Sequence, residues 1–132
     1  MFTKKKIIKQ TILFLWCLPQ NILGLIVLAF TKLQHAKTER YKDTFLTKWK
    51  YSSGGSIGCF IFVPENTDEK IIKHEYGHYL DSNCLGPLYL PIIFLPSFTW
   101  AAFFKKYREK NNISYYDFYT ERRADRLGEV QN

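Results

Sequence analysis

Two long apolar runs stand out along the chain, one at residues 11–30 and one at residues 84–104. About 20 apolar residues are enough for a helix to cross the hydrocarbon core of a bilayer. The pattern therefore predicts two membrane-associated segments inside a single domain, 1–132, since the chain has no room for a second one. The other reading of the second run is the core helix of a soluble protein.

The first run has lysines on both sides and a break at its centre. Pro19 precedes Gln20 and Asn21 in the middle of the run, and no small-residue cleavage site follows it, so we expect it to stay in the mature protein. Either one span or two short helices that enter and return would fit. Basic flanks on both sides favour the returning form and the cytoplasmic face of the membrane.

The region between the runs alternates between apolar and polar residues. Phe45–Tyr51 alternates loosely, Ser53-Gly54-Gly55 is typical of a turn, and Ile57–Val63 is rich in β-formers and closed by Pro64. These features predict a β-hairpin over residues 43–64.

Helical spacing returns in two further stretches. Residues 67–82 follow a cap-like Asn66, with Glu69 three positions on, and residues 114–128 begin with Ser114 and Asp117 in capping-box spacing. Both stretches are predicted to be helices, and both carry candidate chemistry.

On the first of these helices, His74 and His78 are four residues apart, and Glu75 directly follows the first histidine. Positions i and i+4 share one helix face, so the two imidazoles can bind one metal ion. Glu75 is offset by about 100° around the helix, which suits a general base acting on a metal-bound water better than a ligand.

The second helix is expected to supply the third ligand. Glu121 and Asp125 lie on one stripe of residues 114–128, and two carboxylates in that spacing repel each other unless a cation is near. We assign Glu121 as a zinc ligand and Asp125 as the acceptor of a hydrogen bond from a ligand histidine, which fixes the tautomer of that histidine. The alternative is an exposed helix whose charges pair with one another.

The motifs "HEYGH" and "ERRAD" together resemble the zinc peptidases of the gluzincin group, in particular the membrane-embedded HtpX-like and CAAX prenyl protease type. In that family the second helix carries Glu-x-x-x-Asp, commonly ending in Ala-Asp and followed by a glycine. Glu121, Ala124, Asp125 and Gly128 match this pattern, and the resemblance covers two helices, about a quarter of the chain. It implies a zincin-like fold, zinc binding and peptide-bond hydrolysis.

A zinc site would constrain the second apolar run, because the run lies between His78 and Glu121. A single crossing would place these ligands on opposite sides of a bilayer. Three prolines within the run also make one long helix costly. We therefore expect residues 84–104 to turn back as a helical hairpin or to lie along the interface.

The net charge of +7 raises the question of nucleic acid. The basic residues flank apolar runs and form no stripe with interleaved aromatics, so membrane lipids are the expected partner and nucleic acid is not. The three cysteines have unrelated spacings, and we interpret all of them as small buried hydrophobic residues: Cys17, Cys59 and Cys84.

These observations predict an α+β protein. It would be a mainly helical, zincin-like mini-domain with a β-hairpin before the metal helix and two apolar, membrane-associated hairpins or segments. The expected function is a membrane-associated peptidase that uses Zn²⁺ and Glu75 to hydrolyse a peptide or protein substrate. An edge strand before the metal helix could bind an extended peptide by strand addition. Candidates to stabilise the oxyanion are Tyr76, Tyr79, Tyr115, Tyr116, Tyr119 and Arg122.

Two other hypotheses remain open. A non-catalytic zinc-binding membrane protein, acting as a partner or regulator, would bind metal through the same residues and tolerate Glu75→Gln. A small basic membrane protein without metal would not respond to a chelator.

Overall fold

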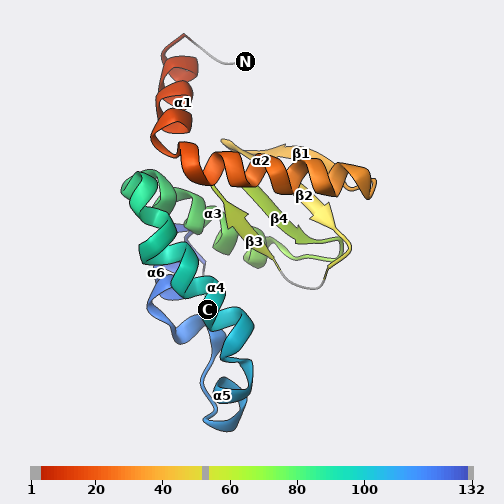
Figure 1. Cartoon of the computed structure of the whole chain (residues 1–132), viewed down its shortest axis with the longest axis vertical. Coiled ribbons are helices and arrows are strands. Elements are labelled where there is room, and N and C mark those ends of the chain that lie inside the picture. Colours follow the sequence, from red (N-terminus) through yellow and green to blue (C-terminus); the bar gives the residue numbers. More distant parts are fainter. Residues whose placement is uncertain (1–3, 52–53, 131–132) are drawn as a thin grey trace.

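The computed structural model describes residues 4–51 and 54–130, which form a four-stranded mixed sheet with helices on both of its faces (Figure 1). The α+β class is therefore confirmed. The strands are β1 (Lys37–Tyr41), β2 (Thr44–Trp49), β3 (Gly55–Ile57) and β4 (Phe60–Pro64). The α-helices are α1 (Lys4–Trp16), α2 (Leu18–Leu33), α3 (Glu69–Leu85), α4 (Leu95–Phe103), α5 (Lys105–Lys110) and α6 (Tyr119–Leu127).

The sheet has the strand order β1-β2-β4-β3, and the predicted hairpin over residues 43–64 is wrong. Its two predicted strands do pair, but in parallel, with Phe45 opposite Phe60. The chain reverses instead between β1 and β2, at Lys42, and between β3 and β4, at Gly58, and both of these residues have positive φ. Positive φ suits tight hairpin turns, so the reversals lie there. Of the predicted turn Ser53-Gly54-Gly55, Ser53 lies outside the described residues and Gly55 begins β3.

Each face of the sheet is covered by one helix. Leu46, Ile61 and Val63 point to one face and pack against Ile71 and Ile72 of α3. Phe60 points to the other face and meets α2 at Gly24, where a Cβ would lie only 2.6 Å from the ring of Phe60. Alternate side chains of β4 therefore contact α3 on one face and α2 on the other, and the strand is buried on both sides.

The first apolar run forms α1 and α2, which meet at Cys17 with a bend of 91°. The break precedes Pro19, which lies in the first turn of α2, where its missing N–H costs little. Within residues 4–51 and 54–130, no one helix is long and apolar enough to cross a membrane. The bent pair α1–α2 is long and apolar enough only when the two helices are counted as one segment.

Side-chain hydrogen bonds tie this bend to the carboxyl end of α3. The indole of Trp16 donates to the carbonyl of Asn83, and the amide of Gln20 donates to the Ser82 hydroxyl and to the carbonyl of Gly86. Gln20 is fully buried although it lies in an apolar helix. The bend is thus fixed by hydrogen bonds as well as by packing.

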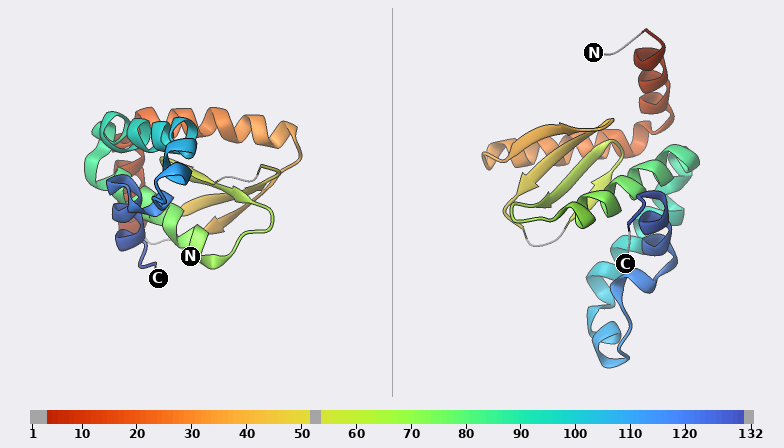
Figure 2. Two further views of the ribbon diagram at one scale, coloured as in Figure 1. Left: turned by 90° about the horizontal axis from the view of Figure 1, so that it is seen from below. Right: turned by 180° about the vertical axis from the view of Figure 1, so that it is seen from behind.

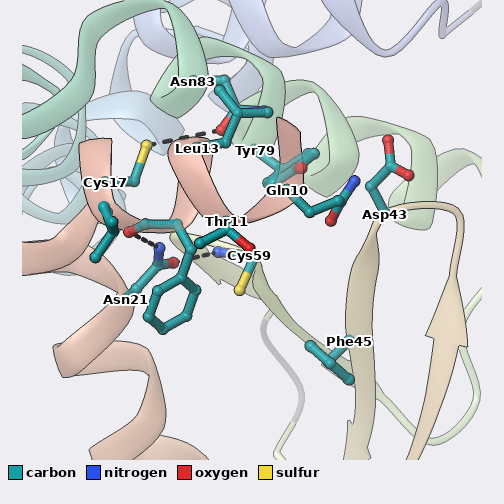
Figure 3. Close-up of a pocket in the computed structure, with 12 residues that line it drawn as sticks. Gln10, Thr11, Leu13, Cys17, Asn21, Asp43, Phe45, Cys59, Tyr79 and Asn83 are labelled. Atoms are coloured by element: carbon teal, nitrogen blue, oxygen red, sulfur yellow. Dashed lines mark hydrogen bonds between the residues drawn. The ribbon is translucent and has the colours of Figure 1, made fainter. Parts of the chain in front are cut away.

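Beside the bend, residues of α1, α3 and the turn between β1 and β2 line a half-open cavity of about 290 Å³, and none of the predicted metal ligands lies in its wall (Figure 3). Cys17 and Cys59 lie at this cavity. Cys17 is buried and Cys59 half-buried, whereas Cys84 is exposed, so the expectation that all three are buried is wrong for Cys84. Burial raises the pKa of the Cys59 thiol to about 11, which keeps it protonated.

The second apolar run does not form a hairpin of its own. It leaves α3 through a turn at Gly86, which has φ of 56°, and then continues through a π-helical turn, η2 (Leu90–Phe94), into α4. Pro91 and Pro96 occupy first-turn positions of η2 and α4, which is why they do not break this stretch. The chain reverses only after α5, and α1 and α5 project from opposite ends of the molecule (Figure 2).

The two predicted metal helices are present with changed boundaries. α3 is capped by Asp68, whose side chain accepts from the amide of Ile71, and not by Asn66. The capping box of Ser114 and Asp117 exists, but it caps the 3-10 turn η3 (Tyr115–Asp117). Phe118 is extended, so α6 begins only at Tyr119.

Candidate metal centre

Two glycines let α3 and α6 lie in direct contact. A Cβ on Gly77 would lie 1.8 Å from the carbonyl oxygen of Ala124, and one on Gly128 would lie 1.9 Å from that of Lys73. No side chain fits in such gaps. The close approach of these helices brings residues from distant parts of the sequence together.

The structure brings His74, His78 and Glu121 into one buried group. The Nε2 atoms of His74 and His78 lie 3.1 and 3.0 Å from the same oxygen, Oε1 of Glu121. One candidate ligand atom from each residue lies within 4.8 Å of the others. These three residues could therefore hold a metal ion.

Asp125 lies on the far side of His74, where its Oδ1 accepts a hydrogen bond of 2.6 Å from Nδ1. This bond leaves Nε2 of His74 facing the group, as a metal ligand requires. Burial opposes the charge on His74, but the hydrogen bond to Glu121 and the carboxylates of Glu75 and Asp125 outweigh it and raise the pKa of His74 to about 9. Without metal, His74 is therefore protonated at neutral pH.

Glu121 is fully buried, and its second oxygen is also occupied. Oε2 accepts hydrogen bonds from the hydroxyl of Ser97 at 2.6 Å and from that of Thr120 at 2.5 Å. Burial alone would raise the pKa of Glu121, but the hydrogen bonds from the two histidines outweigh it and hold the pKa well below its usual range. Neither hydroxyl group was predicted to lie at the site, because Ser97 is part of an apolar run whose pattern gives no sign of such a contact.

Glu75 faces a cavity of about 100 Å³ beside His78. Its Oε2 is buried and has no hydrogen-bond partner among the described residues, and the same holds for Nδ1 of His78. Burial raises the pKa of the Glu75 carboxyl. The cavity wall is formed by Gly54, Gly55, Ser56, Glu75, His78, Tyr89, Phe94, Ser97, Phe98, Ala101 and Tyr115.

One of the six oxyanion candidates lines this cavity, namely Tyr115. Burial and the nearby Glu121 raise the pKa of Tyr115 far above its usual value, which keeps its hydroxyl a hydrogen-bond donor. Tyr116 instead packs edge-on against His74, on the side of Asp125, and the hydroxyl of Tyr119 donates to the carbonyl of Ile92. Arg122 is exposed, and Tyr76 and Tyr79 do not line the cavity.

A bidentate ion pair also joins α3 and α6, and it was not predicted from the sequence. Arg123 of α6 donates from Nε to Oδ2 of Asp81 at 2.9 Å and from a terminal nitrogen to Oδ1 at 2.5 Å. Asp81 is fully buried on α3. The basic residues of α6 are thus not all engaged with acids on their own helix, as the exposed-helix alternative would require.

The metal-free protein should lose stability as pH rises from about 6.5 to 9. The folded-state pKa of His74 is about 9, above its ordinary value of 6.5. The contribution of protonated His74 to folding stability is therefore complete below pH 6.5 and is lost as the residue deprotonates in the folded protein. Zinc must displace this proton, so apparent zinc affinity should rise across the same interval. Urea midpoints in chelator and zinc titrations at several pH values measure both effects. His35→Gln is the control, and a flat profile in wild type would contradict the expectation.

No protein-family model, curated protein or solved structure matches this chain. The geometry of this site and the motifs that form it are therefore the features that indicate a function.

Proposed function

We propose that the protein is a zinc-dependent peptidase, with His74, His78 and Glu121 as metal ligands and Glu75 as general base. The observation that carries this proposal is the convergence of the two Nε2 atoms and Oε1 of Glu121 beside a buried oxygen of Glu75 that has no hydrogen-bond partner among the described residues. Two histidines and a glutamate are a known ligand set of catalytic zinc and leave one position for water. The donor atoms present thus fit a zinc ion.

In the proposed reaction, the residues of the chain bind, orient and transfer protons. Zinc held by the three ligands would polarise the scissile carbonyl and acidify the attacking water. Glu75 accepts the proton of that water and later delivers it to the leaving amine, and its raised pKa suits both steps. Tyr115 lines the same cavity and can donate a hydrogen bond to the developing oxyanion.

An extended peptide is the substrate that best fits the surroundings of Glu75. β3 is an edge strand of the sheet, and Gly54, Gly55 and Ser56 at its start line the cavity next to Glu75. A Cβ on Gly55 would meet nothing within 4 Å, so there is space beside the strand. Strand addition along β3 would carry a peptide bond past Glu75.

Membrane association is the second part of the proposal. Large apolar side chains on α1, α2 and α4 are exposed, more than isolated surface residues would explain. Lysines flank these helices, and cations beside an apolar surface suit a bilayer with anionic headgroups. The exposed side chains include Ile7, Ile8, Ile12, Leu15, Trp16, Ile22, Leu25, Ile26, Phe30, Leu95, Phe98 and Phe103.

The test of the metal site is the zinc content of the purified protein. We expect about one zinc per chain in wild type and almost none in His78→Ala and Glu121→Ala, because two ligands hold zinc too weakly to survive purification. Elemental analysis measures the ratio, and Glu129→Ala, at an exposed glutamate beyond α6, is the matched control.

If Glu121→Ala retained zinc, Glu121 would not be a metal ligand, and the proposed site would be wrong. A protein that keeps zinc in wild type, loses it in both variants, but hydrolyses no peptide would instead be the non-catalytic metal-binding protein.

A further inference from the structure

The two oxygens of the Glu121 carboxylate lie in different surroundings. Oε1 faces both histidines, at 3.1 and 3.0 Å. Oε2 accepts two hydroxyl hydrogen bonds, from Ser97 at 2.6 Å and from Thr120 at 2.5 Å. Hydrogen bonds from two hydroxyl groups hold Oε2 away from the point where the ring nitrogens converge.

The two hydroxyl groups come from different elements. Thr120 neighbours Glu121 on α6, whereas Ser97 belongs to α4, 24 residues earlier in the chain. α4 is packed against the residues around α6 by Trp100, which stacks on Phe118 with ring centroids 4.7 Å apart and donates to the carbonyl of Tyr115. Leu95 and Phe98 of α4 are apolar and exposed, and Phe98 also lines the cavity beside Glu75.

We propose that Ser97 is a positioning residue of the metal centre: with Thr120 it holds Glu121 as a ligand through one oxygen, and it makes metal binding depend on the packing of α4. This inference rests on the proposed role of Glu121 as a zinc ligand. It goes further by giving the second apolar run a direct part in the site.

Ligation through one oxygen matters for the proposed chemistry. A carboxylate that binds zinc through both oxygens would raise the coordination number from four to five and crowd the position that catalytic zinc keeps open for water. By engaging Oε2, Ser97 and Thr120 preserve that position. Residues that orient metal ligands in this way typically change metal affinity roughly 10- to 100-fold when removed.

The experiment compares Ser97→Ala, Ser97→Thr and Thr99→Ala in the full-length protein. Ser97→Thr keeps the hydroxyl group, and Thr99→Ala removes a hydroxyl from the same helix that bonds only the carbonyl of Leu95 among the described residues. Zinc Kd is measured by competition with a chromogenic chelator. The visible spectrum of the Co²⁺-loaded protein reports coordination number, because four-coordinate Co²⁺ absorbs more strongly than five-coordinate Co²⁺. Urea midpoints in chelator check that each variant folds.

We expect Ser97→Ala to raise the zinc Kd roughly 10- to 100-fold and to weaken the Co²⁺ absorption, with Ser97→Thr and Thr99→Ala close to wild type. If Ser97→Ala binds zinc as tightly as Thr99→Ala and has the same Co²⁺ spectrum, the inference is wrong while the proposed function stands. If wild type binds no zinc, or Glu121→Ala binds it normally, the proposed function fails and the inference fails with it.

Discussion

Glu75→Gln should lower peptidase activity roughly 100- to 10,000-fold while zinc content stays at the wild-type level. The glutamine amide can fill the same space beside His74 and His78 but cannot accept a proton. The measurement is the rate of hydrolysis of a pool of fluorogenic peptides, together with elemental analysis of the same samples. Full activity in a variant that retains zinc would rule out Glu75 as the general base.

The stability of Glu75→Gln separates lost chemistry from lost structure. Burial raises the pKa of Glu75, so its ionisation destabilises the folded state at neutral pH, and Oε2 has no partner among the described residues to offset this. In chelator at pH 7, Glu75→Gln should unfold at the same or a higher urea concentration than wild type. Glu69→Gln, which changes an exposed glutamate at the start of α3, is the matched control and should alter neither activity nor stability.

Gly77→Ala should destabilise the protein by about 3 kcal/mol or more and abolish zinc binding. The new Cβ would lie 1.8 Å from the carbonyl oxygen of Ala124, which belongs to the backbone of α6 and can move only if the helix moves. Any shift of α6 takes Glu121 and Asp125 away from His74. Urea denaturation and zinc analysis measure the two effects.

Gly55→Ala is the control for this glycine, because a Cβ at position 55 meets nothing within 4 Å. It should cost little stability and leave zinc binding unchanged. If Gly77→Ala matched Gly55→Ala in both measurements, the close contact of α3 and α6 would not be what holds the ligands together.

The pairing of candidate ligands on each helix was predictable from the sequence because it depends on helical spacing. His74 and His78 share a face of α3 for the same reason that Glu121 and Asp125 share a face of α6, namely that positions four apart are neighbours on any helix. The second apolar run was expected to turn back as a helical hairpin or to lie along the membrane interface. The chain reverses after α5, at Asn112, and not within residues 84–104.

The pairing of the strands was not predictable from residue types alone. Phe45–Tyr51 and Ile57–Val63 look like two arms of one hairpin because a glycine-rich segment separates them. Which strands pair depends on where the chain reverses, and therefore on which residues take positive φ. Lysine at position 42 is not a residue type that predicts positive φ. The hydrogen bonds of Ser97 and Arg123 were equally unpredictable, since each joins a partner in another element, Glu121 and Asp81 respectively.

The hydrogen bonds at the bend between α1 and α2 can form only late in synthesis of the chain. The partners of Gln20 at Ser82 and Gly86 lie 62 and 66 residues further along the chain. At about 5–20 residues per second, the ribosome makes them roughly 3 to 13 s after Gln20. During that interval the side-chain amide of Gln20, which is fully buried in the folded protein, lacks its final partners. α1 and α2 must therefore remain hydrated or shielded until α3 and Gly86 have been made.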